Sequence, residues 1–343
     1  MSLPRPAAPA EQGGNGPVGA PTVLSLRGLH VTYAGEVQAI RGLDLDVAQG
    51  ETVAVVGESG CGKSTLAAAI MGLLPPTAAV SGAVWLAGVD VYHGGPRNAK
   101  EARRIRGQLA GLVIQDPGSS FNPVLRVGAH VVEARRLHDA RPPAGGFWTW
   151  AVGLLRELRI DAASRRARQY PHEWSGGMLQ RAAIAAASAN HPRLLVADEP
   201  TASLDASLAV DVVQGLRERQ QRQGAAMLLI THQLGLAAEV ADRLAVMYAG
   251  RIVEVGPAVT VIARPRHPYT RGLVAALPRP GGGFPGPLEG ELPSLAPAPP
   301  GCAFSARCRL AVAACAAGEP PPLIDGVACP IVVPASERGG AGR

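Results

Sequence analysis

The sequence predicts an α/β protein built on a parallel sheet, followed by a small, irregular C-terminal extension that contains cysteines. Three apolar runs, TVAVV, RLLVADEP and AMLLITH, are each followed by polar residues and then a helical stretch, as crossover connections between parallel strands require. Past residue 256 the composition changes, and 14 of the 24 residues at 278–301 are Pro or Gly. That segment cannot form regular helix or sheet.

Composition sets the broad class of the chain. Its 343 residues suggest about two domains at roughly 150 residues each. Hydrophobic residues make up 47% and charged residues 17%, which is typical of globular proteins. No apolar run reaches the length of a membrane-spanning helix, and the N-terminus lacks a basic flank followed by an apolar core. We therefore expect neither an integral membrane protein nor an exported one.

The net charge of +6 does not by itself indicate a nucleic-acid partner. The Arg residues are scattered and aromatic residues are only 4%, so no basic stripe with stacking aromatics is present. We expect no nucleic-acid binding. Lys63 and Lys100 are the two lysines of the whole sequence, which makes the position of Lys63 informative.

The elements of the first half follow from local patterns. A leader at 1–22 is rich in Pro, Gly and Ala, and we expect it to be flexible. LSLRGLHVTY and LDLDVAQGE alternate apolar and polar residues as strands do, and LAAAIMGLL predicts a helix after the glycine-rich turn. The Arg-rich stretch 100–106 predicts a solvated helix face.

The remaining elements follow in order. Residues 117–168 are expected to be helical, with an exposed loop at PPAGG (142–146). RLAVMYAGRIVEVG predicts a hairpin that turns at Ala249-Gly250, and 269–277 predicts a helix. The expected domains are the leader, a domain at 23–256 with a helical subdomain at about 117–190, the extension at 257–334, and a flexible tail at 335–343.

The strongest chemical signal is a phosphate-binding loop. The run Gly57, Glu58, Ser59, Gly60, Cys61, Gly62, Lys63, Ser64, Thr65 satisfies G-x-x-x-x-G-K-[ST] between a strand and a helix. Its glycines let backbone N–H groups surround phosphate oxygens, while Lys63 reaches the outer phosphates and Ser64 binds Mg²⁺. The alternative, a Gly-rich turn that matches by chance, does not account for the strand and helix on either side.

Two carboxylates follow the second apolar run. Asp198 would support Mg²⁺ at the end of its strand, and Glu199 would polarise the attacking water. A solvated acidic pair is the alternative. Further along, Ser175, Gly176 and Gly177 precede a helix and expose a hydroxyl and N–H groups to an anion, where the alternative is a simple helix-start turn.

With these motifs in order, the chain resembles the ATP-binding cassette ATPases over about 23–256. The resemblance implies a P-loop NTPase cassette with a helical subdomain and an antiparallel β subdomain, which binds ATP and Mg²⁺. It also implies roles for further residues: Tyr33 stacks on adenine, Gln115 contacts Mg²⁺ and the transporter, Ser175, Gly176, Gly177 and Gln180 face the nucleotide of an opposite subunit, Asp205 lies at the dimer contact, and His232 senses the γ-phosphate. A core-edge Tyr33 and a strand-capping His232 are the alternatives.

Several segments resemble the ATPase subunits of bacterial dipeptide and oligopeptide importers, above all RHPYTRGLVAALP and the GCAFSARC start of the cysteine region. The chain departs from that pattern at Trp174, Leu179 and Gln233. The resemblance implies a peripheral protein at the cytoplasmic face of the membrane. Its partners would be two permease subunits, a second related ATPase or a copy of itself, and indirectly an extracytoplasmic solute-binding protein. An importer of nickel or another small solute is one alternative, and a soluble nucleic-acid-associated cassette ATPase is another.

Four cysteines in the extension, Cys302, Cys308, Cys315 and Cys329, lie within 28 residues. Their spacing fits zinc poorly, and a cytoplasmic disulfide is disfavoured. Four thiolates can hold an iron–sulfur cluster, and the resemblance to peptide-importer subunits favours a [4Fe-4S] centre, with zinc or unligated thiols as alternatives. We expect such a cluster to be structural and far from ATP, with Arg307 and Arg309 offsetting the thiolate charge. Cys61 needs no chemical role.

Overall fold

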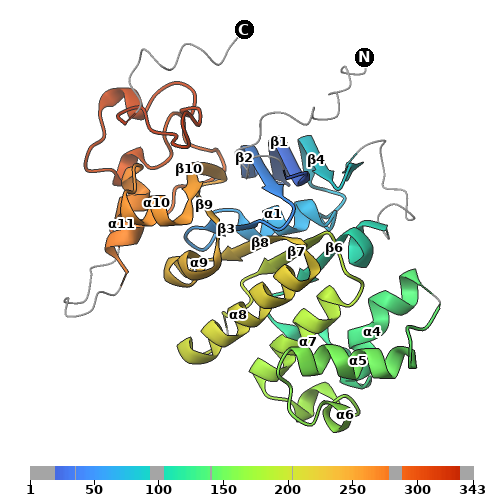
Figure 1. Cartoon of the computed structure of the whole chain (residues 1–343). Helices are drawn as coiled ribbons and strands as arrows, with labels where there is room; N and C mark the ends of the chain where they lie inside the picture. The colour runs from blue at the N-terminus through green and yellow to red at the C-terminus, as the bar shows by residue number, and fades with distance from the viewer. Residues whose placement is uncertain are drawn as a thin grey trace, which may run out of the picture.

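The computed structural model describes residues 20–34, 36–92, 104–139, 141–202, 204–277 and 288–332. A six-stranded sheet forms its centre, in the order β10-β9-β3-β8-β7-β6 (Figure 1). Its strands are β3 (Thr52–Val56), β6 (Ala110–Val113), β7 (Leu194–Asp198), β8 (Ala226–Thr231), β9 (Arg243–Tyr248) and β10 (Arg251–Pro257). All neighbours pair in parallel except β9 and β10, which form the hairpin predicted at Ala249-Gly250.

A second, antiparallel sheet carries the N-terminal strands in the order β2-β1-β4-β5. Its strands are β1 (Thr22–Tyr33), β2 (Val37–Ala48), β4 (Ala79–Leu86) and β5 (Val89–Asp90). Helix α1 (Lys63–Ile70) lies between the two sheets, and its Leu66 and Ile70 are fully buried in a core that both sheets share. This layering fixes the start of α1, and with it the glycine-rich loop, against the central sheet.

A lobe of helices lies beyond the β6 edge of the central sheet (Figure 1). It contains α3 (Pro117–Ser120), α4 (Val127–His138), α5 (Gly146–Glu157), α6 (Ala163–Arg166), η2 (Pro171–Glu173) and α7 (Gly176–Ser188). Helix α8 (Ala206–Gln223) runs between this lobe and the sheet, and α9 (Leu234–Val240) follows β8. Leu179, one of the departures noted above, is 8% exposed in the lobe's apolar core, which accounts for a hydrophobic side chain at that position.

One local expectation is confirmed only in part, and another was wrong. The helix predicted over LAAAIMGLL ends at Ile70, because Gly72 takes a left-handed conformation with φ of 62° and leaves the helix. The described part of the Arg-rich stretch is not a solvated helix face. It is an irregular turn, η1 (Ile105–Leu109), in which Arg106 and Gly107 leave helical geometry and Ile105 is 3% exposed. The rest of that stretch, 100–103, lies outside the described residues.

The C-terminal extension packs against the β9–β10 hairpin. It begins with α10 (Ala258–Ala263) and α11 (Pro268–Ala275), and the short turns η3 (Ser305–Arg307) and η4 (Ala313–Cys315) follow. Backbone bonds from Val255 N to Gly326 O (2.7 Å) and from Ala328 N to Val253 O (2.8 Å) attach it to the edge of β10. Residues 288–301 contain neither helix nor strand, as predicted. Most of the leader and all of the tail lie outside the described residues.

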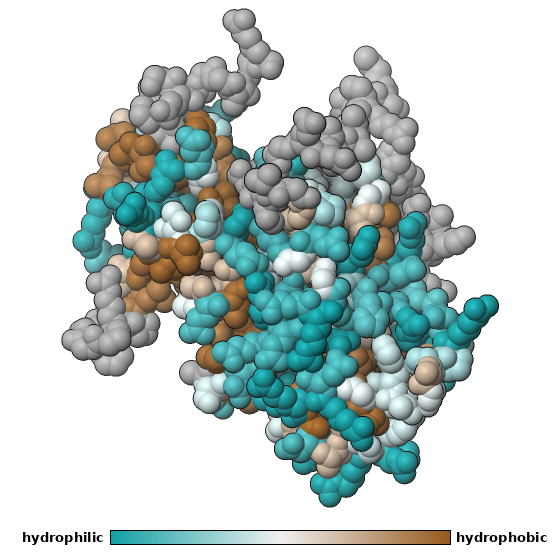
Figure 2. Space-filling model, in the orientation of Figure 1, coloured by the Kyte–Doolittle hydropathy of each residue, from teal (hydrophilic) through white to brown (hydrophobic). Residues whose placement is uncertain are grey.

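The surface of this extension differs from that of the rest of the visible face. Figure 2 shows hydrophobic residues gathered over the extension, whereas the face that α8 crosses is largely hydrophilic. In the extension, Leu310 and Val312 are 50% and 57% exposed. Within the described ranges, no helix combines the length and the apolar character needed to cross a bilayer.

Candidate ATP site

The glycine-rich loop between β3 and α1 leaves no room for a side chain at two of its glycines. A Cβ at Gly57 would lie 2.2 Å from the carbonyl oxygen of Met247, and one at Gly62, where φ is 109°, would lie 2.3 Å from that of Ala39. Side chains at these positions would displace the loop, so glycine is required. Ser59 and Gly60 are exposed, and Cys61 is fully buried, which raises the pKa of its thiol.

Lys63 folds back over this loop. Its Nζ donates to the carbonyl oxygens of Gly57 (2.8 Å) and Glu58 (3.1 Å), and it lies 3.7 Å from Glu199 Oε1. The side chain is only 6% exposed. A buried ammonium with a nearby carboxylate and loop carbonyls is placed to exchange these partners for phosphate oxygens.

Ser64 and Asp198 meet across the gap between α1 and β7. Ser64 Oγ donates to Asp198 Oδ1 over 3.4 Å. Burial raises the pKa of Asp198, and the bond from Ser64 opposes that shift. A hydroxyl and a carboxylate are hard oxygen donors, and this donor set suits Mg²⁺.

Glu199 and His232 form the next contact along the sheet edge. Glu199 is 8% exposed and has a φ of +48°, a left-handed conformation that costs a non-glycine residue energy and often occurs at functional sites. Its Oε2 lies 2.8 Å from His232 Nδ1 and accepts a bond of 3.3 Å from the His232 backbone N–H. Lys63, Glu199 and His232 therefore form one continuous polar chain.

The sheet register accounts for this convergence. Val56 pairs with Thr231, Asp198 with Ile230, and Val113 with Ala197, so β3, β8, β7 and β6 end at one edge. Gln115, two residues past β6, is exposed at the same edge. Tyr33, the last residue of β1, lies near the first turn of α1, where its hydroxyl is 3.2 Å from Thr65 Oγ1.

The second glycine motif starts helix α7 in the helical lobe. Ser175 is its N-cap and its Oγ accepts from Met178 N–H at 3.4 Å. A Cβ at Gly177 would lie 2.4 Å from Leu208 Cδ2, so this glycine lets α7 approach α8 closely, whereas Gly176 is unconstrained. Asp205 is the N-cap of α8 through a bond from Leu208 N–H at 2.9 Å. Gln180 is 1% exposed and donates to the carbonyl of Ile114 (3.4 Å), next to Gln115.

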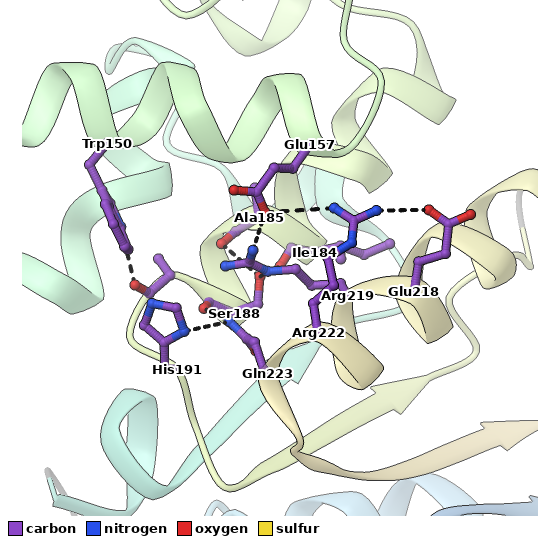
Figure 3. A network of polar contacts seen from close by, with 11 residues as sticks. Trp150, Glu157, Ile184, Ala185, Ser188, His191, Glu218, Arg219, Arg222 and Gln223 are labelled. Atoms are coloured by element: carbon purple, nitrogen blue, oxygen red, sulfur yellow. Dashed lines mark hydrogen bonds and ion pairs between the residues drawn. The ribbon is translucent and has the colours of Figure 1, made fainter. Parts of the chain in front are cut away.

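A polar network centred on the buried Arg219 joins the helical lobe to α8 (Figure 3). Arg219 of α8 is paired with Glu157 of α5, and its Nε donates to Ser188 Oγ of α7 at 3.2 Å. Gln223 donates to the Ser188 carbonyl at 2.9 Å. Burial lowers the pKa of Arg219, which Glu157 offsets. The lobe that carries Ser175 is thus attached to the core through charged as well as apolar contacts.

Glu58 has neighbours that were not predicted from the sequence. Arg307 of the extension pairs with both Glu58 carboxylate oxygens, at 2.7 and 2.9 Å, and Tyr269 Oη accepts from Glu58 N–H at 3.0 Å. The expectation that the cysteine region lies far from the phosphate loop was therefore wrong. Arg307, which was expected to offset thiolate charge, is paired with Glu58 in this structure. Arg309, unlike Arg307, lies at the surface, where it is paired with Glu289. No local sequence signal marks a contact between residues 249 apart.

The four cysteines of the extension lie within electrostatic range of each other. Burial raises the pKa of Cys302 to about 11, and the Cys329, Cys315 and Cys308 thiols add to that shift. Cys302 N–H also donates to the carbonyl of Cys315 at 2.7 Å. In the described parts of the chain, however, no three or more His, Cys, Asp or Glu side chains are arranged to hold a metal ion.

Comparison with known proteins identifies the family of this chain. Residues 40–202 match the ABC transporter family, and residues 253–315 match the family described as oligopeptide/dipeptide transporter, C-terminal region. The dipeptide transport ATP-binding protein DppD of Bacillus subtilis is 41% identical over 300 residues, which cover 85% of this chain and 88% of that protein. The chain belongs to the ABC transporter family. Within it, the chain has the C-terminal region of oligopeptide/dipeptide transporters.

Further relatives agree with this placement. The oligopeptide transport ATP-binding protein OppD of Bacillus subtilis is 41% identical over 84% of this chain and 81% of its own length. Among solved structures, a dimeric ATP-binding cassette, MJ0796, bound to ADP and Pi after hydrolysis, has a TM-score of 0.60 and 26% identity, over 68% of this chain and 98% of that one. The cassette CbiO1 of Clostridium perfringens has a TM-score of 0.61 and 25% identity, over 71% and 91%. The predicted fold class is confirmed.

Proposed function

We propose that this chain is the ATP-hydrolysing subunit that powers import of dipeptides or oligopeptides through a membrane permease complex. The observation that carries the proposal is the polar chain Lys63–Glu199–His232 beside Ser64–Asp198, in a protein whose 253–315 segment matches the peptide-transporter C-terminal region. The names of its relatives, dipeptide and oligopeptide transport ATP-binding proteins, support the peptide substrate.

The geometry supports the following roles. Lys63 moves from its loop carbonyls to the outer phosphates of ATP, and Tyr33 lies beside the loop where adenine would stack. Ser64, Asp198 and Gln115 would hold Mg²⁺, which neutralises charge on the phosphates when bound. Glu199 orients and polarises the attacking water, held by its bond with His232. His232 and Lys63 stabilise the charge that develops on the transferred phosphoryl group.

Hydrolysis in this proposal needs two cassettes. The chain contains one phosphate loop and one Ser175 motif, and the Ser175 motif starts a helix in the separate helical lobe. Ser175, Gly176, Gly177 and Gln180 would complete the site of an opposite subunit, with Asp205 near the contact. That subunit is a second copy or a related ATPase, and the dimeric form of the MJ0796 cassette supports such an arrangement.

A hollow of about 620 Å³ between β6, α4 and α7 is the proposed contact for a permease segment. Phe121, His130 and Leu137 line it, and Leu137 is 65% exposed. It lies beside the Gln115 loop, so a segment seated there would sense changes at the nucleotide. In this proposal the chain lies at the cytoplasmic face of the membrane, and a solute-binding protein acts on the other side.

The test is transport in cells that lack this chain. Wild-type protein should restore uptake of labelled di- or oligopeptides, and Glu199→Gln, expressed at the same level, should not. Uptake of labelled nickel in the same cells, without peptide uptake, would replace the peptide assignment with the nickel alternative. Failure of wild-type protein to restore uptake of either solute would contradict the importer proposal.

We also propose the [4Fe-4S] cluster at Cys302, Cys308, Cys315 and Cys329. Four thiols are the usual ligands of such clusters, and the contribution of the other three thiols to the raised pKa of Cys302 supports the choice of these four residues. Their present arrangement is not that of a formed metal site, so ligation would require the thiols to move. Anaerobic purification with iron, acid-labile sulfide and zinc analysis decides: zinc, or four titratable thiols without metal, would contradict the cluster and leave the importer proposal unaffected.

A further inference from the structure

We infer that Arg307 of the C-terminal extension is a positioning residue for the phosphate loop, and that its ion pair with Glu58 sets the affinity of the cassette for ATP. The inference uses the ATP site of the proposed function. It adds to that function a residue from a separate part of the chain. This residue contacts neither the glycines of the phosphate loop nor the carboxylates of Asp198 and Glu199.

The ion pair has the geometry of a strong, specific contact. Arg307 Nη1 lies 2.7 Å from Glu58 Oε2 and Nη2 lies 2.9 Å from Oε1, so the guanidinium binds the carboxylate through two parallel bonds. The side chain of Arg307 is 5% exposed and that of Glu58 is 27% exposed. Solvent therefore screens this pair less than an ordinary surface salt bridge, and its planar fork fixes orientation as well as distance.

The extension holds Arg307 rigidly. Its Nε donates to the carbonyl of Glu289 at 2.9 Å, and its guanidinium carbon lies 5.8 Å from the ring centres of both Tyr248 and Phe304. Those two rings pack edge to face, with centres 5.3 Å apart. The position of Arg307 is therefore set by the fold of the extension on β9, and a free side chain in solvent could not replace it.

The N–H, the carbonyl and the carboxylate of Glu58 each have a polar partner. Arg307 binds its carboxylate, the fully buried Tyr269 accepts from its N–H, and Lys63 donates to its carbonyl at 3.1 Å. Arg307 and Tyr269 both belong to the extension. Glu58 thus links the extension to Lys63, the residue that reaches the phosphates.

Two physical effects of the pair favour ATP binding. The pair fixes the first turn of a loop whose N–H groups must converge on phosphate oxygens, so less conformational entropy is lost when ATP binds. It also neutralises a carboxylate that otherwise stands in the loop that receives the phosphates. Without Arg307, the loop is less ordered and more negative, and both changes weaken binding.

The experiment measures ATP affinity with a fluorescent ATP analogue and Mg²⁺, on the full chain carrying Arg307→Ala, Arg307→Lys, Glu58→Gln or both Arg307→Ala and Glu58→Gln. Arg307→Ala is expected to raise the Kd about tenfold, as loss of a buried charge-assisted bidentate contact does. Arg307→Lys, which keeps the charge and loses the fork, should give a smaller rise. Arg309→Ala is the matched control, because Arg309 is 86% exposed and pairs only across the surface with Glu289.

A positioning role and a merely structural role give different results. If the pair acts as a unit, the double variant binds ATP no more weakly than Arg307→Ala alone, and KM for ATP rises while kcat at saturating ATP stays near that of wild type. Independent, multiplying effects of the two substitutions would overturn the inference, as would a Kd within twofold of wild type for a folded Arg307→Ala. If Arg307→Ala does not fold, Arg307→Lys decides by the same criteria. Failure of wild-type protein to bind ATP would instead contradict the proposed function.

Discussion

Glu199 Oε2 accepts a hydrogen bond from His232 at a distance of 2.8 Å, Nδ1 to Oε2. A carboxylate oxygen that carries no proton can only accept, so a hydrogen bond between these two atoms requires the tautomer with its proton on Nδ1. The Nε2 atom of the same ring is left for another partner, and the imidazole is 48% exposed. The histidine therefore holds the glutamate from one side and faces the open part of the site from the other.

The first prediction concerns the attacking water. Glu199→Gln retains the shape of the side chain and an oxygen that can accept from His232, but it loses the ability to polarise water. We expect ATP binding to be kept and turnover to fall about 10²- to 10⁴-fold, the usual contribution of a general base. Phosphate release and equilibrium ATP binding are measured on the same preparation. Phosphate release near the wild-type rate would contradict the role of Glu199.

The second prediction concerns binding itself. Lys63→Ala removes the ammonium that lies over the loop carbonyls, and with it a charge-assisted bond to the phosphates. We expect ATP affinity to fall roughly tenfold to hundredfold. Lys100→Ala serves as the control, since it removes the other lysine of the sequence. Equal ATP affinities of Lys63→Ala and wild type would refute the phosphate-loop assignment.

The third prediction concerns the shared site. A chain with Lys63→Ala and a chain with Ser175→Arg are each expected to be inactive as homodimers. Mixed together they form a heterodimer in which one phosphate loop and one Ser175 motif are both intact, so the mixture regains at most one working site per dimer. ATP hydrolysis is followed as the ratio of the chains is varied, and Ser175→Arg alone should still bind ATP.

The contradicting result is a single chain that hydrolyses ATP at the full rate at high dilution. If the partner is a related ATPase, the same two substitutions are placed one in each subunit of that pair, and the same count of working sites applies.

The fourth prediction concerns pH. His267 caps α11, with Nδ1 accepting from Tyr269 N–H at 3.1 Å, and its burial lowers its pKa to about 4. The unfolded histidine takes up a proton near pH 6.5, so between pH 6.5 and 4 the unfolded state binds more protons than the folded one. Above pH 6.5 the neutral, buried His267 should make its full contribution to the free energy of unfolding. This free energy should fall by up to about 3 kcal/mol as the pH drops to 4.

Chemical denaturation at several pH values checks this prediction. His267→Asn is the control, because Asn is a good helix cap that does not titrate. The wild-type protein should lose more stability than the variant across this pH range. Parallel pH profiles would show that His267 does not contribute.

Much of the ATP site could be predicted because its parts obey local rules. The phosphate loop is continuous in sequence, and Asp198, Glu199 and His232 each follow an apolar strand, so parallel pairing brings them to one edge without further information. The hairpin at Ala249-Gly250 followed from its turn residues in the same way.

Other features depend on long-range packing and have no local signal. Charge alone predicted a solvated helix at 100–106, although Ile105 is buried and anchors an irregular turn. Gln180 lies in a motif associated with nucleotide, yet in this structure it is buried against Ile114. The partner of Glu58 could not be found from the sequence: Arg307 stands out there only as a neighbour of Cys308, and nothing local connects it with a residue 249 positions away. The domain boundaries and the roles of the individual site residues stay predictions.

The distance in sequence between Glu58 and Arg307 also has a consequence for biosynthesis. The ribosome makes the phosphate loop first and its ionic partner 249 residues later. At roughly 5–20 residues per second, about 12–50 seconds separate the two events. During that interval the nascent cassette has the glycine-rich loop, both sheets in part and the helical lobe, but not the arginine that fixes Glu58. A nascent chain that ends before Arg307 lacks this ion pair, and on the inference above it would bind ATP more weakly than a chain that includes it.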